Sequence, residues 1–92
     1  MAKLSSSEIT SALSNLPGWE GGESGIKRSY KFKDFVESMG FVNKVALLAE
    51  KADHHPDIEI SYNRVALTLV THSEGGVTTN DTEMASNINA LG

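Results

Sequence analysis

The stretch DIEISYNRVALTLVTH, residues 57–72, decides the fold because it contains two alternating runs separated by a turn residue. In each run, large apolar residues occupy every second position, as in a strand with one buried face. In the second run, Val65, Leu67 and Leu69 face one way, and the residues between them, with His72, face the other. Asn63 suits a tight turn. The stretch therefore predicts a hairpin with strands over about residues 57–62 and 64–72.

Further elements are predicted outward from this hairpin. In order, they are a helix over residues 5–15, a short strand from Trp19, a strand over 26–32, a helix over 34–53, the hairpin above, and a helix from about Thr78. Ser5, Asp34 and Thr78 are each followed three residues later by an acid, which is typical of helix starts. Gly40 lies inside the long helix, where glycine costs about 1 kcal/mol relative to alanine, and we expect it to mark close packing.

The order helix, two strands, helix, two strands, helix predicts an α+β fold. We expect a four-stranded antiparallel sheet with three helices packed on one face, in the order α-β-β-α-β-β-α. With 92 residues, the chain is expected to form a single domain over residues 1–92. A chain this short has a small core, so support from an oligomer interface is plausible.

Composition narrows the class of protein. There is no cysteine, which excludes a disulfide framework and a thiolate zinc site. The net charge is −4 with no run of Lys or Arg, which argues against nucleic acid as the main partner. The sequence lacks the pattern of a secretory signal and an apolar run of the roughly 20 residues that cross a membrane. We expect a cytoplasmic protein with no membrane partner.

The stretch EKADHHPD, residues 50–57, carries the candidate chemistry. Pro56 biases His55 toward an extended backbone, while His54 lies at the end of the long helix. The hairpin should bring His72 close to them, and three imidazoles in one cleft would form a proton-transfer site. The alternatives are histidines that merely cap a helix end, or a metal site, although adjacent histidines bind one ion awkwardly.

These residues resemble the signature of pterin-4a-carbinolamine dehydratases. The matching positions are Glu50, His54-His55-Pro56, Tyr62, His72 and Asp81, at the family's spacings. The segments GW at 18–19, YKFKDF at 30–35, AEKADHHPD at 49–57 and YNRVALTLVTH at 62–72 are similar as well. The resemblance covers about residues 13–91. One departure is Ile58-Glu59, where animal members often have an aromatic pair, so a stacking role there is not carried over.

The resemblance implies a dehydratase that removes water from 4a-hydroxytetrahydropterin to give quinonoid dihydropterin, with no metal and no organic cofactor. It implies a homodimer or a homotetramer, and a link to aromatic amino-acid hydroxylases, which form the substrate. The animal enzyme also binds a homeodomain transcription factor, and no residue here supports that second role. The alternative is a catalytically silent, dehydratase-like module for protein interaction or assembly, since small sheets have edges that can pair with partners.

The resemblance also implies a set of site residues. Asp53, His54 and His55 would line the pocket from the helix end, and Thr71, His72 and Ser73 from the fourth strand. His54 and His55 would be the acid–base pair, in either order, and His72 would position the pterin and share in the proton transfer. Glu50 and Asp53 would orient the rings or accept hydrogen bonds from the pterin, and Asp81, which completes the signature, would be a further substrate-binding residue. Trp19 is either a core residue or a ring-stacking group.

Overall fold

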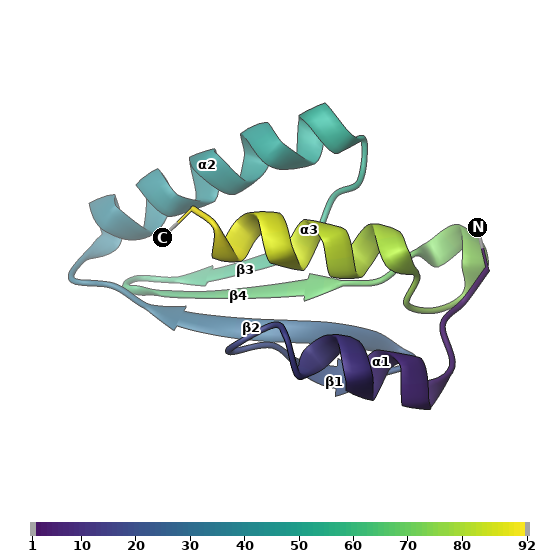
Figure 1. The fold of residues 1–92 in the computed structure, drawn as a ribbon. Coiled ribbons are helices and arrows are strands. Elements are labelled where there is room, and N and C mark those ends of the chain that lie inside the picture. The colour runs from purple at the N-terminus through teal and green to yellow at the C-terminus, as the bar shows by residue number, and fades with distance from the viewer. Residues whose placement is uncertain (1, 92) are drawn as a thin grey trace.

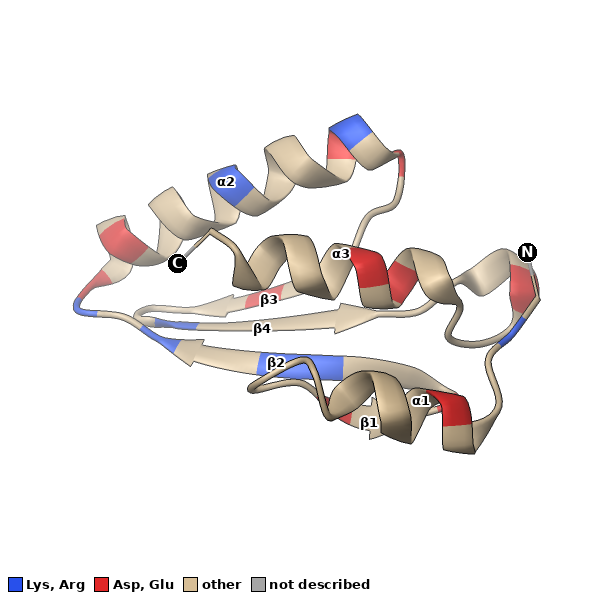
Figure 2. Ribbon diagram, viewed as in Figure 1, with Lys and Arg blue, Asp and Glu red and all other residues tan. Residues whose placement is uncertain are grey.

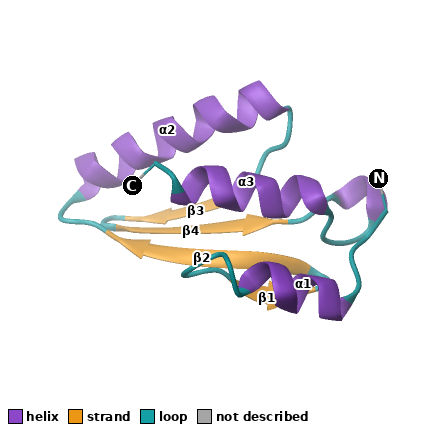
Figure 3. Cartoon of the chain, in the orientation of Figure 1, coloured by secondary structure: helices purple, strands orange, loops and turns teal. Residues whose placement is uncertain are grey.

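The computed structural model describes residues 2–91 and shows the predicted α+β arrangement (Figures 1 and 3). The elements are α1 (Ser6–Leu13), β1 (Glu20–Gly22), β2 (Gly25–Lys31), α2 (Phe35–Ala52), β3 (Asp57–Ser61), β4 (Arg64–Leu69), the short 3₁₀ helix η1 (His72–Glu74) and α3 (Thr79–Asn89). The antiparallel sheet has the order β1-β2-β4-β3, so β1 and β3 are its edges. The fold class and the element order predicted from the sequence are confirmed.

Capping side chains set the helix starts as the sequence indicates. The Ser5 hydroxyl accepts a hydrogen bond from the Glu8 backbone N–H at 3.2 Å, and the Glu8 carboxylate accepts one from the Ser5 N–H at 2.8 Å. The bond from the Ser5 N–H to the carboxylate, together with the nearby Ser5 hydroxyl, lowers the pKa of Glu8 below its ordinary value. At the start of α2, the Asp34 carboxylate accepts a hydrogen bond from the Glu37 N–H at 2.9 Å. Each cap satisfies backbone donors that lack a partner within the helix.

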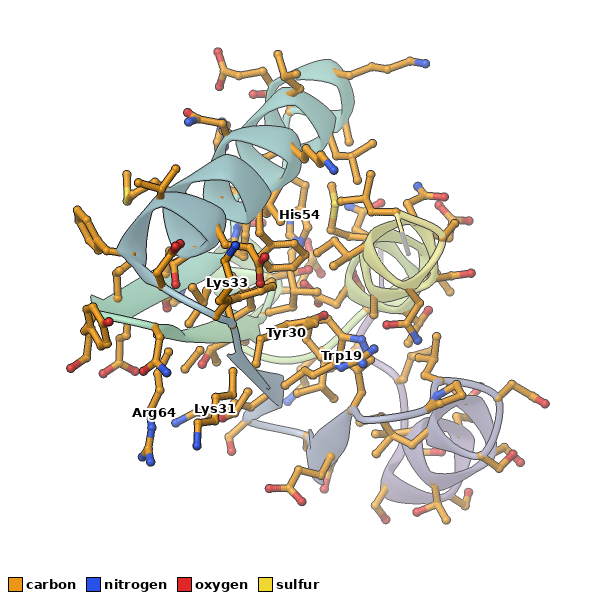
Figure 4. All side chains as sticks on the ribbon, turned by 90° about the vertical axis from the view of Figure 1, so that its left-hand side faces the viewer. Trp19, Tyr30, Lys31, Lys33, His54 and Arg64 are labelled. Atoms are coloured by element: carbon orange, nitrogen blue, oxygen red, sulfur yellow. The ribbon has the colours of Figure 1, made fainter. Side chains whose placement is uncertain are left out.

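The core lies between the sheet and the helices. Val65, Leu67 and Leu69 of β4 are all at most 1% exposed, and the residues between them are more accessible. Figure 4 shows Tyr30 on the helix side of the sheet and Lys31 and Arg64 projecting from the other side. The three helices therefore cover one face, and the alternation read from the sequence correctly separates the two faces.

The last strand ends earlier than predicted. The sequence predicts a strand to residue 72, whereas β4 ends at Leu69 and His72 belongs to η1. The partners run out at this point: β2 pairs with β4 only as far as Ile26 opposite Leu69, and β3 only from Asp57 opposite Thr68. Beyond them the chain turns back on itself through an isolated bridge between Thr71 and Gly76.

The expectation that Gly40 in α2 marks close packing is wrong within the described chain. A Cβ atom added to Gly40 would meet nothing within 4 Å, so this glycine does not mark close packing within the chain. Gly40 is exposed. Val36, about one turn before it, and Leu47, about two turns after it, are 79% and 73% exposed. No helix in residues 2–91 combines the length and the apolarity needed to cross a bilayer.

Candidate active site

The C-terminus of α2 is a sharp, hydrogen-bonded turn. Asp53 adopts a left-handed conformation, with φ of 51° and ψ of 42°, which Asp tolerates better than most residues. The Asp53 N–H donates to the Glu50 carbonyl at 3.3 Å, and the His54 N–H donates to the Ala49 carbonyl at 3.1 Å. This pair of bonds is the Schellman arrangement. His54 is therefore held by the helix end rather than frayed from it.

His54 points from this turn to the start of α3. Its Nε2 lies 2.5 Å from Oδ1 of Asp81, and the Asp81 side chain is fully buried. With Asp81 as a carboxylate, the imidazole Nε2–H is the donor, so Nδ1 of the neutral ring is an acceptor. Nδ1 has no hydrogen-bond partner within residues 2–91. The His54 side chain is 15% exposed. This is the arrangement of a histidine base oriented by a carboxylate.

Asp81 also anchors a buried network of hydroxyl groups. Its Oδ2 accepts hydrogen bonds from the Thr78 backbone N–H at 2.9 Å and from the Thr71 hydroxyl at 2.8 Å. Since the Thr71 proton is used there, the Thr78 hydroxyl donates to Thr71, at 2.8 Å. Asp81 thus joins the end of α2, the segment after β4 and the start of α3. Thr78 is missing from the predicted site, although its capping-box spacing to Asp81 was the signal for it.

His55 forms a separate pair with Glu50. Its Nε2 lies 2.5 Å from Oε2 of Glu50, and both side chains are accessible, at 55% and 76% exposure. Because the pair lies in solvent, its contribution to the free energy of folding is small, about 0–1 kcal/mol. The pair therefore does little to support the fold.

The third histidine reaches this region through its neighbour. His72 directly follows Thr71, whose hydroxyl is bonded to Asp81, so the segment that carries His72 is attached to the carboxylate that orients His54. The His72 and Ser73 side chains are exposed and form no hydrogen bond with other residues of the described range. Both are therefore available to a ligand at the same end of the molecule.

Trp19 lies elsewhere. It is 5% exposed, and its Nε1–H donates to Oδ1 of Asn89 at 2.9 Å. Asn89 is eight residues along α3 from Asp81, which is about 12 Å in a helix. Trp19 is buried, as the core alternative predicts, and its stacking against a ligand stays a prediction. The Arg28 guanidinium, which sequence reasoning missed, shares Asn89 Oδ1 and also donates to the Pro17 carbonyl at 3.1 Å.

Several acidic residues lie in the elements that form the site. Figure 2 shows acidic residues where α2 ends, next to a basic one, in the first half of α3 and in η1, whereas β2 is basic. The Asp81 carboxylate of α3 is buried and does not belong to the surface. Asp53 is exposed at the turn between Glu50 and His54. Within residues 2–91, no three His, Asp or Glu side chains are arranged to hold a metal ion. The described groups are proton donors and acceptors, the chemistry of general acid–base catalysis.

The comparisons with known proteins agree with one another. The family profile described as pterin 4 alpha carbinolamine dehydratase matches residues 2–91. A protein of Acidobacterium capsulatum, provisionally named pterin-4-alpha-carbinolamine dehydratase, is 53% identical over 91 residues, 99% of each chain. One from Thermomicrobium roseum with the same provisional name is 50% identical over 91 residues, 99% of this chain and 98% of its own.

Solved structures share the fold. The crystal structure of a transcriptional coactivator/pterin dehydratase from Brucella melitensis has a TM-score of 0.90 and 50% identity, covering 97% of each chain. A pterin dehydratase-like RuBisCO assembly factor of the alpha-carboxysome has a TM-score of 0.65 at 20% identity, covering 79% of this chain and 84% of its own, and shows the fold alone. The fold and the site thus define a class of protein: small α+β proteins with a histidine–carboxylate pair. This chain belongs to the pterin-4a-carbinolamine dehydratase family.

Proposed function

We propose that this protein removes water from a 4a-hydroxytetrahydropterin to give the quinonoid dihydropterin. Membership of the family supports the substrate class, and the bonded chain from His54 through Asp81 to Thr71 is the observation that carries the mechanism. In this elimination the C4a–O and N5–H bonds break and a C4a=N5 double bond forms. Both proton transfers are general acid–base steps, and neither needs a covalent intermediate.

We assign the base to His54. Its Nε2–H is engaged by the Asp81 carboxylate, so Nδ1 is the nitrogen that can take the N5 proton. The buried carboxylate would stabilise the imidazolium formed in this step, as in other carboxylate–histidine pairs. Asp81 itself is held by donors from Thr71 and Thr78, so the ring does not have to reorganise during the reaction.

We assign the acid to His55, with His72 as the group that positions the pterin. His55 is accessible and stands next to the base in the chain, so it can deliver a proton to the leaving hydroxyl. Glu50 holds the ring of His55. Glu50 and Asp53, with the hydroxyls of Thr71 and Ser73, are the groups that we propose to meet the polar edge of the pterin. The reaction would use no metal and no organic cofactor.

The test is the loss of ultraviolet absorbance of the 4a-hydroxy adduct. His54→Ala and His55→Ala should each slow turnover by about 10²–10⁴-fold, the contribution of one general acid or base. His72→Ala should mainly raise KM. Lys27→Gln, on the helix-free face of the sheet, is the matched control and should leave the rate unchanged. Undiminished turnover in His54→Ala would reject the assignment of the base.

The alternative of a catalytically silent assembly module predicts a different result. The pure protein would then be no faster than buffer, and a stoichiometric protein partner would bind a variant without His54, His55 and His72 as well as it binds the natural chain. The assembly factor with the same fold shows only that this fold also occurs in assembly proteins. Turnover that depends on His54 would exclude the silent module.

We further propose that the protein is a homo-oligomer in the cytoplasm, supplied with substrate by an aromatic amino-acid hydroxylase. Two surfaces support self-association: the exposed side of α2, with Val36 and Leu47, and the edge strand β3, where Ile60 is 39% exposed. One surface would give a dimer and both would give a tetramer. Leu47→Glu and Ile60→Glu, examined by light scattering, should each reduce the mass of the assembly. A mass unaffected by both changes would reject these interfaces.

A further inference from the structure

A hollow lies at the opposite end of α2 and α3 from the histidines. It has a volume of about 580 Å³ and opens between β2, the first half of α2 and the last turn of α3. Figure 4 views this end of the molecule, with Tyr30 between the sheet and the helices. The side chains that give it chemical character are Arg28, Tyr30, Phe32, Glu37, Phe41 and Lys44. Its volume lies in the range of small-molecule sites.

Three aromatic rings form one wall of this hollow. The centroid of Phe41 lies 4.5 Å from that of Tyr30 and 5.1 Å from that of Phe32. The rings of Tyr30 and Phe32 are nearly parallel, at an interplanar angle of 8°. Packing of this kind holds the rings in place, so the wall is preformed and offers ring surface to a flat ligand.

The Tyr30 hydroxyl is buried and has no hydrogen-bond partner within residues 2–91. Burial raises the pKa of Tyr30 above its ordinary value, and the neighbouring Arg28 guanidinium opposes that shift. A buried hydroxyl without a partner costs about 1–3 kcal/mol. In native proteins such a group needs an explanation, and a ligand that hydrogen-bonds to it is one.

Two cations stand beside the aromatic wall. The Arg28 guanidinium carbon lies 4.5 Å from the centre of the Tyr30 ring, and Nη1 is fixed by the Pro17 carbonyl and Asn89 Oδ1. Lys44 borders the hollow from α2. Neither cation forms an ion pair with a carboxylate in residues 2–91.

Glu37, the remaining charged residue of the hollow, forms a structural hydrogen bond. Oε1 of Glu37 accepts a hydrogen bond from the Lys33 backbone N–H at 3.0 Å, before the start of α2. The hollow thus combines preformed ring surface, a hydroxyl that lacks a partner, and the cations of Arg28 and Lys44. Its one carboxylate, that of Glu37, is already hydrogen-bonded to the backbone. These are the features that recognise a planar aromatic ring bearing a negative charge.

We propose that this hollow is a binding site for a planar aromatic carboxylate. The ligand ring packs against Phe41, beside the Tyr30 ring that Arg28 covers. The carboxylate is bound by Lys44 and by the N–H groups of Arg28 other than those of Nη1, and it accepts the hydrogen bond of the Tyr30 hydroxyl. The site is separate from the histidines, since Lys44 lies eight residues before the end of α2 at Ala52, about 12 Å in a helix, and His54 follows the turn beyond that end. The proposal does not depend on the dehydratase activity.

The experiment is a titration of the full chain with 2-naphthoate, followed by NMR chemical shifts and by the fluorescence of the probe. Saturable binding is expected, with shifts at Gly40 and Phe41. Lys44→Gln should weaken it about tenfold and Tyr30→Phe about fivefold, the sizes of a charged and a neutral hydrogen bond. Lys27→Gln, on the same strand as Tyr30 but on the other face, should bind like the natural chain. The neutral probe 2-naphthamide should bind at least about tenfold more weakly.

Tyr30→Phe separates a ligand site from a purely structural role. Removing an unpartnered hydroxyl should leave the thermal stability equal or higher, so weaker binding in a stably folded variant can only be attributed to the lost contact. The proposal is overturned if 2-naphthoate shows no saturable binding at millimolar concentration, or if 2-naphthamide binds equally well. Affinity unchanged in both variants, or lost in His54→Ala instead, would also overturn it.

Discussion

The two ends of the α2–α3 pair differ in whether their buried polar groups have hydrogen-bond partners. At the histidine end, the Asp81 carboxylate and the Thr71 and Thr78 hydroxyls are all hydrogen-bonded. This one buried carboxylate joins three segments. At the other end, aromatic rings form one wall of a hollow, and the Tyr30 hydroxyl has no partner in the described chain. The first end is rigid because its polar groups are satisfied, and the second keeps a hollow at some expense of stability.

The largest effect should come from removing the carboxylate that organises the histidine end. Asp81→Ala leaves donors from His54, Thr71 and Thr78 without their acceptor, and we expect a loss of about 3–5 kcal/mol in the free energy of unfolding. Urea denaturation measures this loss. Turnover should also fall, because the imidazole loses its orienting partner.

Asn89→Ala is the matched change at the other end of α3. Its side chain accepts from Trp19 and Arg28 and donates to the Pro17 carbonyl at 3.2 Å, in a partly accessible place where water can substitute. We expect a loss of about 1–2 kcal/mol. Equal losses in the two variants would contradict the contrast between a buried network and an accessible one.

The comparison also shows what the sequence could predict. The histidine end was accessible to sequence reasoning because local rules apply there: Thr78 and Asp81 have capping-box spacing, and Pro56 forces the chain to leave α2 near His55. The aromatic end depends on side chains that β2 and the end of α3 bring together. No local pattern links Arg28 to Asn89, since they are 61 residues apart.

Trp19→Phe tests whether the two ends are functionally independent. Phenylalanine loses the hydrogen bond to Asn89 and part of the buried ring, and we expect a loss of about 1–2 kcal/mol in the free energy of unfolding. Because Trp19 lies away from the histidines, kcat/KM should stay within about twofold of the natural value. A large fall in kcat/KM in the folded variant would show that Trp19 takes part in substrate binding.

Gly40→Ala examines the exposed side of α2. Nothing within the chain opposes a methyl group at this position, so the helix propensity of alanine should stabilise the fold by about 1 kcal/mol. For a domain of this size, Tm should rise by about 4–8 °C. A lower Tm would mean that a second copy packs against Gly40, and mass measurement of the same variant would then show a smaller assembly.

Gly40 illustrates the limit of reading close contacts from composition. A glycine inside a helix indicates that a side chain is absent for some reason, but the sequence does not say which neighbour requires its absence. Likewise, the alternation after Leu69 continues to His72, yet a strand needs partners, and both neighbouring strands have ended there. Periodicity predicts which residues face inward. Pairing partners, which lie far away in the chain, decide where a strand stops.

The smallest effect should be a pH dependence that belongs to the aromatic end alone. Burial raises the pKa of Tyr30 above the ordinary value of 10.0, so the folded state favours the neutral phenol. Its contribution to stability is present in full below pH 10 and is lost as the pH rises through the folded pKa. Urea denaturation between pH 8 and 11 should therefore show a shallower decline of the free energy of unfolding in Tyr30→Phe than in the natural chain.

Tyr62→Phe, at a position that is 64% exposed, is the control and should follow the natural chain. Identical declines in all three proteins would show that the Tyr30 hydroxyl is hydrated, and the contrast between the two ends would then rest on the hollow and its charges.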